Sequence, residues 1–356
     1  MRKTGLVLAV AGLVAVTPAA RPAAPLLPEP SFSVPGALEG LAVAGSRVAV
    51  SAWCEVRVAT LRAARKPEAP PARVRGLPCD DPDSGSFFVS DLWLGRRSLA
   101  AELIQAESPH GAEYSVWKGP LPSGPLRLLG EEWGWRDDNP DEPSYGCAGV
   151  VVAGGGVIAS TEVPNRLGDS TEPACPSNGT TSIALDGAAR GRTTVRGSWT
   201  LLATDGKRLA LSRLDARGRP TGQLSLVRLD GKPVATPRMR PATVKAASSG
   251  WLAPEGLVLQ TRAGIAGPGW AIRGVFTATV AYGRVLYLRG NALRGRRIRD
   301  GVDRKVLTLP RASEEKLVAA GSFGLALAVQ TGDEEASRTS VYRIGWRVID
   351  AVLPLR

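Results

Sequence analysis

Histidine is almost missing from this sequence: the 356 residues contain one, His110. Reactions that need two imidazoles are therefore excluded. The chain also lacks a Gly-x-Ser-x-Gly motif, the turn that exposes the nucleophile of many serine hydrolases. Without that motif, a catalytic triad built on His110 is not expected. We predict instead that His110 lies in a surface loop, because it stands between apolar runs.

Charged residues are also scarce, at 22%, whereas 44% of the chain is hydrophobic. That proportion excludes intrinsic disorder, since a chain this apolar can build a core. The 41 glycines and 28 prolines make up about one residue in five and exclude a coiled coil. A length of 356 residues would ordinarily indicate two domains, but closed β architectures of this size often form one unit.

A long apolar run occurs once, at the N-terminus. Arg2 and Lys3 precede twelve apolar residues, 5–16, and small residues follow at 17–20. This order predicts a secretory signal peptide over residues 1–20, and the run is shorter than the roughly 20 residues that cross a bilayer. No cysteine stands near the cleavage region to carry a lipid anchor. We expect a secreted or cell-envelope protein, monomeric and without a membrane span, with a Pro- and Ala-rich leader over residues 21–36.

Cysteine is rare but even in number, which fits disulfides in an oxidising compartment. The four are Cys54, Cys79, Cys147 and Cys175. Three pairings are open, and the spacing favours Cys54 with Cys79 and Cys147 with Cys175, each closing a loop rich in Pro, Asp and Gly. Each closure is expected to stabilise the fold by about 2–4 kcal/mol. A zinc site is not expected, because there is no C-x-x-C and His110 is far from every cysteine.

Acidic residues are fewer than basic ones, 33 against 45, and 37 of the 45 are Arg. Their distribution is uneven: residues 181–356 hold 29 Lys and Arg against 13 Asp and Glu, whereas residues 20–180 hold 14 against 20. The densest basic run, residues 294–305, also contains Asp300 and Asp303. A nucleic-acid partner is not expected, because the basic residues are not interleaved with aromatic ones. We interpret the basic half as a solvated or partner-facing surface.

A repeat runs along the chain: an apolar strand, a tight turn with glycine, and a second apolar strand. Seven copies occur, at residues 41–50, 88–100, 150–159, 201–211, 251–259, 278–287 and 317–327. Glycine supplies the positive φ that such hairpin turns require. A single hairpin is not stable in water, so the copies are expected to bury one another's faces.

The fullest copy covers residues 201–232. An Asp205-Gly206-Lys207 turn joins two strands, and a third strand ends at Asp230-Gly231. This copy resembles the repeat of TolB-like (WD-repeat-like) β-propellers, in which an Asp-Gly-Lys hairpin joins the two inner strands of a blade. The resemblance implies four-stranded blades around a channel. It implies no catalytic residue, because the positions that the family shares are structural.

We therefore predict an all-β fold, a seven-bladed β-propeller of four-stranded antiparallel blades, as a single domain over residues 37–356. The 27-residue step from Gly256 to Gly283 is short for a blade and leaves six blades as the alternative. The 60-residue step from Gly95 to Gly155 is expected to contain a surface loop at residues 130–145. A strand near residues 32–34 is expected to close the ring against strands at residues 340–344 and 346–349.

The most unusual segment is the acidic stretch 131–143, which supplies the candidate ligand-binding residues Trp133, Trp135, Asp137, Asp138 and Asp141. Asp137, Asn139 and Asp141 alternate as calcium ligands do, so calcium is the one cofactor that the sequence allows, and otherwise none is expected. An EF-hand is excluded, because Glu142 and Ala148 stand where that loop needs Gly and Glu. We expect this stretch to be a solvated turn, with a looser calcium site as the alternative. The two tryptophans can stack on a sugar ring or pack the loop onto its blade.

Three functions fit these features. The first is an exported, non-enzymatic propeller that binds a protein or cell-envelope component through loops at one end of the channel. The second is a propeller-type hydrolase or lyase acting on sugars or lactones, assisted by calcium. The third is a structural repeat protein without a small ligand. Convergence of carboxylates from several blades on one channel mouth would favour the enzyme, since a fold alone does not define a function.

Overall fold

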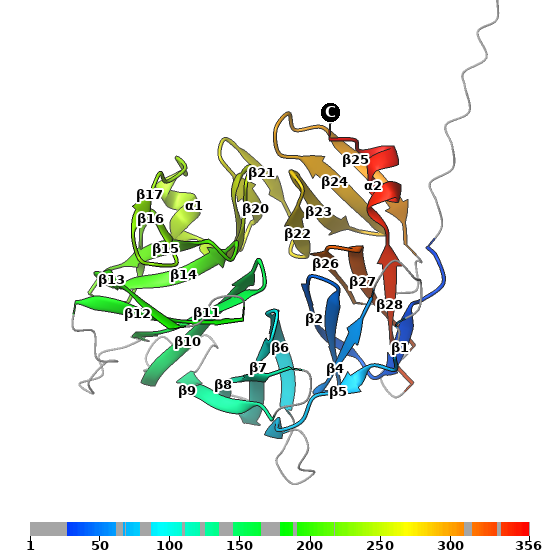
Figure 1. Cartoon of the computed structure of the whole chain (residues 1–356), viewed down its shortest axis with the longest axis horizontal. Helices are drawn as coiled ribbons and strands as arrows, with labels where there is room; N and C mark the ends of the chain where they lie inside the picture. Colours follow the sequence, from blue (N-terminus) through cyan, green and yellow to red (C-terminus); the bar gives the residue numbers. More distant parts are fainter. Residues whose placement is uncertain are drawn as a thin grey trace, which may run out of the picture.

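The chain folds into a seven-bladed propeller of four-stranded antiparallel blades arranged around a channel (Figure 1). The computed structural model describes residues 27–61, 67, 69–78, 87–108, 111–121, 125–134, 145–164, 179–187, 191–216, 218–309, 315–332 and 336–355. The predicted fold is confirmed with seven blades, not six. Neither helix among the described residues is long and apolar enough to span a membrane.

The first three blades occupy the N-terminal half of the chain. Blade 1 consists of β2 (Leu38–Ala44), β3 (Arg47–Ala52), β4 (Glu55–Thr60) and β5 (Ala72–Arg73). Blade 2 consists of β6 (Phe87–Leu94), β7 (Ser98–Ser108), β8 (Gly111–Pro120) and β9 (Arg127–Gly134). Blade 3 consists of β10 (Tyr145–Gly154), β11 (Val157–Pro164), β12 (Thr180–Gly187) and β13 (Gly191–Arg196).

The other four blades complete the ring. Blade 4 consists of β14 (Trp199–Thr204), β15 (Arg208–Leu214), β16 (Pro220–Arg228) and β17 (Pro233–Val234). Blade 5 consists of β18 (Ala247–Ala253), β19 (Gly256–Thr261), β20 (Gly264–Gly267) and β21 (Trp270–Arg273). Blade 6 consists of β22 (Ala278–Ala281), β23 (Arg284–Arg289), β24 (Ala292–Arg297) and β25 (Asp303–Thr308). Blade 7 consists of β26 (Lys316–Gly321), β27 (Gly324–Thr331), β28 (Arg338–Ile344) and β1 (Phe32–Pro35).

The two irregular steps of the repeat have different structural causes. Blade 5 fits its short step because β20 and β21 have four residues each and follow two-residue turns. Blade 2 is long because β7 has 11 residues and β8 has 10. The expected loop at residues 130–145 is therefore wrong at both ends: residues 130–134 extend β9 along β8, and Tyr145 begins β10.

The ring closes as predicted, by pairing the first strand with the last. Phe32 lies opposite Val341 and Val34 opposite Thr339, so β1 completes blade 7. The second expected closing strand, at residues 346–349, is wrong: α2 (Trp346–Val352) forms there. Ile349 and Leu353, four residues apart and fully buried, lie on one side of this helix, where the Leu353 N–H donates to the Ile349 carbonyl.

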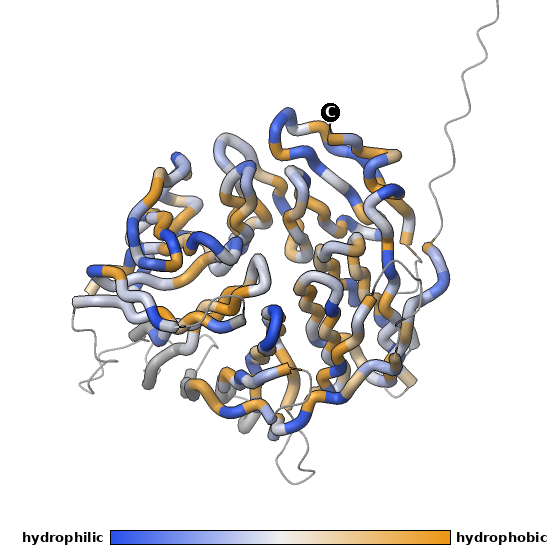
Figure 2. The backbone as a smooth tube through the Cα atoms, in the orientation of Figure 1, coloured by the Kyte–Doolittle hydropathy of each residue, from blue (hydrophilic) through white to orange (hydrophobic). Residues whose placement is uncertain are grey.

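The core lies between the blades. Hydrophobic residues are frequent along the strands and hydrophilic residues are frequent at the turns, as the colours of the backbone in Figure 2 show. One cluster joins blades 3 and 4 through Val157, Leu185, Leu201 and Leu209, all buried. Each blade therefore depends on its neighbours, which is why a single copy of the repeat would not be stable.

The propeller has two unlike faces. Within each blade the chain runs up and down, so the turns from first to second and from third to fourth strand share one face, which we call the turn face. The turns between the second and third strands share the opposite face with the links between blades. We call this second face the loop face. Helix α1 (Pro241–Lys245) belongs to a link and lies on the loop face.

On the turn face, neighbouring blades approach so closely that one glycine is required. Gly45 and Gly155 occupy equivalent turns with φ of 60° and 58°. A Cβ on Gly45 would meet nothing within 4 Å, whereas a Cβ on Gly155 would lie 2.0 Å from the Asp205 carbonyl oxygen. We expect Gly45→Ala to cost about 1 kcal/mol of unfolding free energy and Gly155→Ala about 3 kcal/mol, the difference being the steric clash. Denaturant unfolding of both variants measures this difference, and equal losses would contradict it.

Candidate functional site

The predicted ligand and calcium residues lie in β9 or follow it in the sequence. The backbone of Trp133 lies in β9, opposite Tyr145 and Glu113. Trp135, Asp137, Asp138, Asn139 and Asp141 lie outside the described residues. Across the part of the chain that the structure describes, no three His, Cys, Asp or Glu side chains are grouped to hold a metal ion. The calcium and sugar sites therefore stay predictions.

Two of the four cysteines can be placed. Cys54 is buried in the β3–β4 turn, and Cys147 lies in β10, opposite Pro164. Cys79 and Cys175 lie outside the described residues, as does His110. The disulfide pairing and the loop position of His110 therefore stay predictions.

The channel mouth on the loop face contains a partly buried carboxylate, Glu39 of β2. Its Oε2 accepts three hydrogen bonds: from Ser51 Oγ at 2.8 Å, from the Cys54 N–H at 2.7 Å and from the Val89 N–H at 3.3 Å. Ser51 and Cys54 belong to blade 1, whereas Val89 belongs to β6 of blade 2. Glu39 therefore links two blades through one oxygen atom.

The pKa of Glu39 is raised above 4.5. Burial is the largest cause, because it disfavours the charged form. Hydrogen bonds from Cys54, Ser51 and Val89 act in the opposite direction, and the negative charge of Glu315 raises the pKa further. A buried carboxyl group with a raised pKa is a feature of catalytic acids, but structural carboxyls share it.

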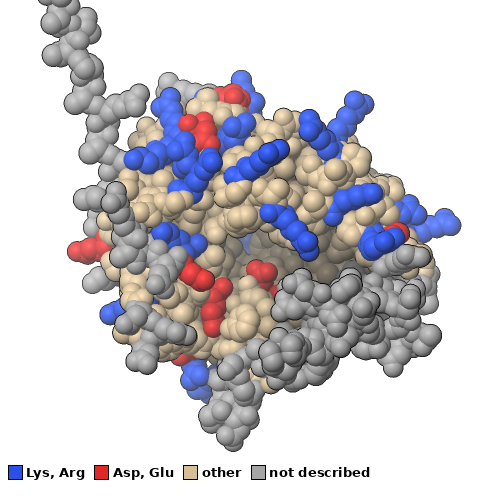
Figure 3. All heavy atoms as spheres, turned by 180° about the vertical axis from the view of Figure 1, so that it is seen from behind, with Lys and Arg blue, Asp and Glu red and all other residues tan. Residues whose placement is uncertain are grey.

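Further carboxylates lie near this mouth. Glu102 of β7 accepts a hydrogen bond from Ser90 Oγ at 2.5 Å and lies opposite Asp91 of β6. Glu315 precedes β26 and interacts electrostatically with Glu39. Glu39 and Glu315 thus interact between blade 1 and the link into blade 7, and the Asp91–Glu102 pair lies on the first two strands of the neighbouring blade 2. We call Glu39, Asp91, Glu102 and Glu315 the acidic rim. Figure 3 shows acidic side chains bordering the hollow on this face.

The turn beside Glu39 has a strained backbone. Trp53 and Cys54 are both in the left-handed region, with φ of 48° and 59°, where residues other than glycine cost about 1–3 kcal/mol each. The Glu39 carboxylate accepts from the Cys54 N–H and so helps to hold this conformation. The turn leaves the Trp53 side chain 49% exposed on the loop face, near Phe88, a second exposed aromatic side chain at the start of β6.

A second charged feature covers blades 4 to 6 of the loop face, in the half of the chain that carries the excess positive charge. Its members are exposed and come from the β17–β18 link, the β19–β20 turn and the ends of β21 and β23. We call it the basic arc, and it consists of Arg238, Arg240, Lys245, Arg262, Arg273 and Arg289. In Figure 3, Lys and Arg side chains gather on this part of the face, across the hollow from the acidic rim.

Sequence reasoning missed the basic arc because its members are spread over four segments. One signal was available: between residues 231 and 299 the only acidic residue is Glu255. Glu255 lies in the β18–β19 turn, on the opposite face. The loop-face connections between residues 232 and 291, which the structure describes without a gap, therefore contain no carboxylate side chain.

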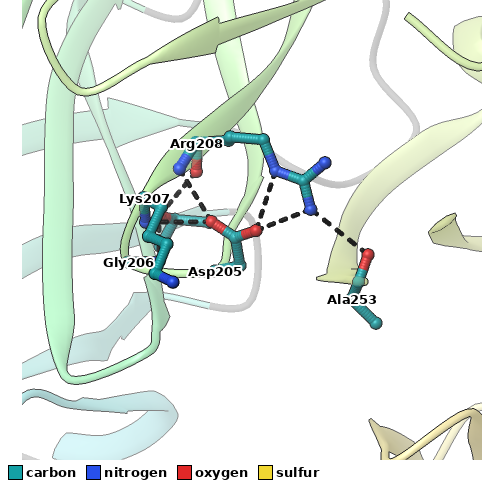
Figure 4. A network of polar contacts seen from close by, with 6 residues as sticks. Asp205, Gly206, Lys207, Arg208 and Ala253 are labelled. Carbon is teal, nitrogen blue, oxygen red and sulfur yellow. Dashed lines mark hydrogen bonds and ion pairs between the residues drawn. The ribbon is translucent and has the colours of Figure 1, made fainter. Parts of the chain in front are cut away.

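Several arginines of the turn face differ from those of the basic arc, because they form ion pairs with aspartates. In Figure 4, Asp205 Oδ2 accepts from Arg208 Nε at 2.9 Å and from Nη2 at 2.7 Å, and Nη2 also donates to the Ala253 carbonyl at 3.3 Å. Asp205 Oδ1 caps the turn by accepting from the Lys207 and Arg208 N–H groups. This network links blades 4 and 5, so the Asp-Gly-Lys turn is structural.

The same pattern recurs around the turn face. Arg284 of β23 is 1% exposed and its Nη2 lies 2.5 Å from Asp350 Oδ1 in α2. Arg297 Nη2 lies 2.7 Å from Asp300 Oδ2 in the β24–β25 turn. No member of the basic arc has an ion-pair partner among the described residues. The basic arc therefore holds free cations, whereas the arginines just named serve the fold.

Comparison with known proteins finds distant structural similarities only. No family model matches the chain, and no curated protein sequence matches it. Among solved structures, it is similar to a chain of a mitotic checkpoint complex, with 13% identity over 97% of this chain and 100% of that chain and a TM-score of 0.46. It is also similar to a glucose dehydrogenase, with 10% identity over 89% and 98% of the two chains and a TM-score of 0.42. No function is drawn from these similarities.

Proposed function

We propose that the chain is an exported, non-enzymatic propeller that binds a protein or another macromolecular component of the cell envelope through its loop face. The observation that carries this proposal is the basic arc: six exposed cations on one face, none with an ion-pair partner within the described part of the chain. Unpaired charges of one sign steer a complementary partner to a surface. Exposed Trp53 and Phe276, at 49% and 67%, add apolar contact area to the same face.

Export is part of the proposal. Its support is Arg2 and Lys3 followed by a twelve-residue apolar run, together with the even number of cysteines. We also propose that the repeat is of the TolB-like kind. The support is the Asp205-Gly206-Lys207 hairpin between the first two strands of blade 4, followed by a third strand that ends before Asp230.

Site-specific photo-crosslinking in the producing cell tests the binding face. We expect crosslinkers at Trp53 and Phe276, on the loop face, to give the same adduct outside the cytoplasm. Matched crosslinkers at Lys207 and Lys232, on the turn face, are expected to give none. Adducts that form equally from both faces, or from the turn face alone, would contradict the proposal.

A hydrolase or lyase acting on sugars or lactones is the second candidate, and the observation that favours it is Glu39, a carboxyl with a raised pKa at the channel mouth. Against it, Oε2 of Glu39 already accepts three hydrogen bonds from the protein. Turnover of a lactone or glycoside by the purified chain, abolished by Glu39→Gln, would support this candidate and displace the first.

A further inference from the structure

The basic arc has the geometry of a row. Its cations come from successive segments of the ring: Arg238, Arg240 and Lys245 precede blade 5, Arg262 and Arg273 belong to blade 5, and Arg289 belongs to blade 6. Each lies at or beside a chain connection of the loop face, so the row follows the ring from blade to blade. A ligand that meets all six must extend along this curve.

Three properties of the face restrict the class of ligand. An anionic bilayer would cover the whole face and would meet the acidic rim, where the exposed carboxylate of Glu315 repels it. A single-stranded nucleic acid needs aromatic platforms, and beside the row Phe276 is the one exposed large apolar side chain of the described loop face in blades 4 to 6. The same scarcity of apolar surface disfavours a protein partner at the row, since protein interfaces have aromatic and aliphatic cores.

We propose that the basic arc binds a linear polymer that carries phosphate groups at regular intervals. This inference rests on the proposed function and names the chemistry that its binding face recognises. Five of the six cations are arginines, whose planar forks bind phosphate oxygens in pairs. A flexible chain of phosphates can follow the row without meeting the acidic rim, which a planar surface cannot do.

Charge-matched variants test the inference, with long-chain inorganic polyphosphate as the probe. The arc variant replaces four cations by Gln: Arg240, Arg262, Arg273 and Arg289. The control variant replaces four exposed cations that lie away from the loop face: Lys207, Lys232, Arg299 and Lys305. Both variants lose the same net charge, and all eight side chains are exposed, so both are expected to fold as the parent chain does.

Titration calorimetry at 50 mM and 200 mM salt gives the readout. We expect the arc variant to bind polyphosphate about 30-fold more weakly than the parent chain, and the control about threefold or less. The parent is also expected to lose affinity steeply with salt, and the arc variant to lose less, because fewer counterions are released. An equal loss in both variants would overturn the inference, since net charge alone would then account for binding.

Three further probes distinguish the other partners. Tighter parent binding to poly-glutamate, to a single-stranded oligonucleotide or to vesicles of anionic phospholipid than to polyphosphate would overturn the inference. Weaker binding of all three would support it. The crosslinking test is made on the parent chain and does not involve polyphosphate. If crosslinks form from Trp53 and Phe276 as expected while polyphosphate binds the arc and control variants equally, the proposed function stands and the phosphate assignment fails.

Discussion

A chain that begins at Gly36 is expected to melt about 6 °C below one that begins at Pro30. The shorter chain lacks β1, which buries Val34 and half-buries Phe32 against blade 7. Burial of such side chains stabilises by about 1.5–3 kcal/mol each, so the loss is about 4 kcal/mol. Thermal melting of the two purified chains measures the difference.

Loss of β1 is also expected to change the solution behaviour, because β28 would become an open edge. In the intact ring, the Ser31 and Gly36 N–H groups donate to the carbonyls of Val341 and Ser337. An unpaired strand edge of this kind pairs with other chains. Size-exclusion chromatography should show aggregates for the shorter chain and a monomer for the control. Melting temperatures within about 2 °C would show that closure contributes little.

Much of the architecture could be predicted because each blade begins with the same local pattern. In blade 3, for example, residues 150–159 consist of two apolar strands joined by glycines with positive φ. This local pattern predicts a hairpin without any knowledge of contacts to distant residues. The size of blade 5 was harder to interpret. Its turns at residues 262–263 and 268–269 have two residues each, so the sequence step from Gly256 to Gly283 is short although the blade has four strands.

Helix α2 shows where local pattern fails. Residues 346–349 are apolar at Trp346, Val348 and Ile349, which fits a strand as well as a helix. The choice depends on Leu353 and Ile349, which pack against blades 6 and 7 only in a helix, and on Asp350, which reaches the buried Arg284. Those partners lie far away in the sequence, so tertiary packing decides the structure.

The site could be predicted less well than the fold. Composition favoured residues 131–143, because that stretch is locally unusual, whereas the cations of the basic arc are each unremarkable in sequence and become one surface only when the blades close. The same is true of Glu39, which reads as an ordinary strand residue. Its role comes from Cys54 and Val89, 15 and 50 residues away.

Glu39→Ala is expected to lower the unfolding free energy by about 3 kcal/mol. The substitution leaves the Ser51 hydroxyl and the Cys54 and Val89 N–H groups without their acceptor, and a buried polar group without a partner costs about 1–3 kcal/mol. It also removes support from the left-handed Trp53–Cys54 turn. Urea unfolding at pH 7 measures the loss, and an unchanged midpoint would show that water replaces the carboxylate.

Glu39→Gln is the matched control, and its effect is expected to have the opposite sign. The amide keeps an oxygen for the three donors but carries no charge, and the raised pKa of Glu39 means that the folded state favours the uncharged carboxyl. Wild-type stability therefore falls as the pH rises from about 4.5 through the folded pKa, whereas the Gln variant lacks this loss. We expect Glu39→Gln to be more stable than wild type at pH 7 and to lose that advantage at pH 4. A Gln variant that is less stable than wild type at pH 7 would contradict this expectation. It would mean that hydrogen bonds to the charged carboxylate stabilise the folded state by more than burial of the charge destabilises it.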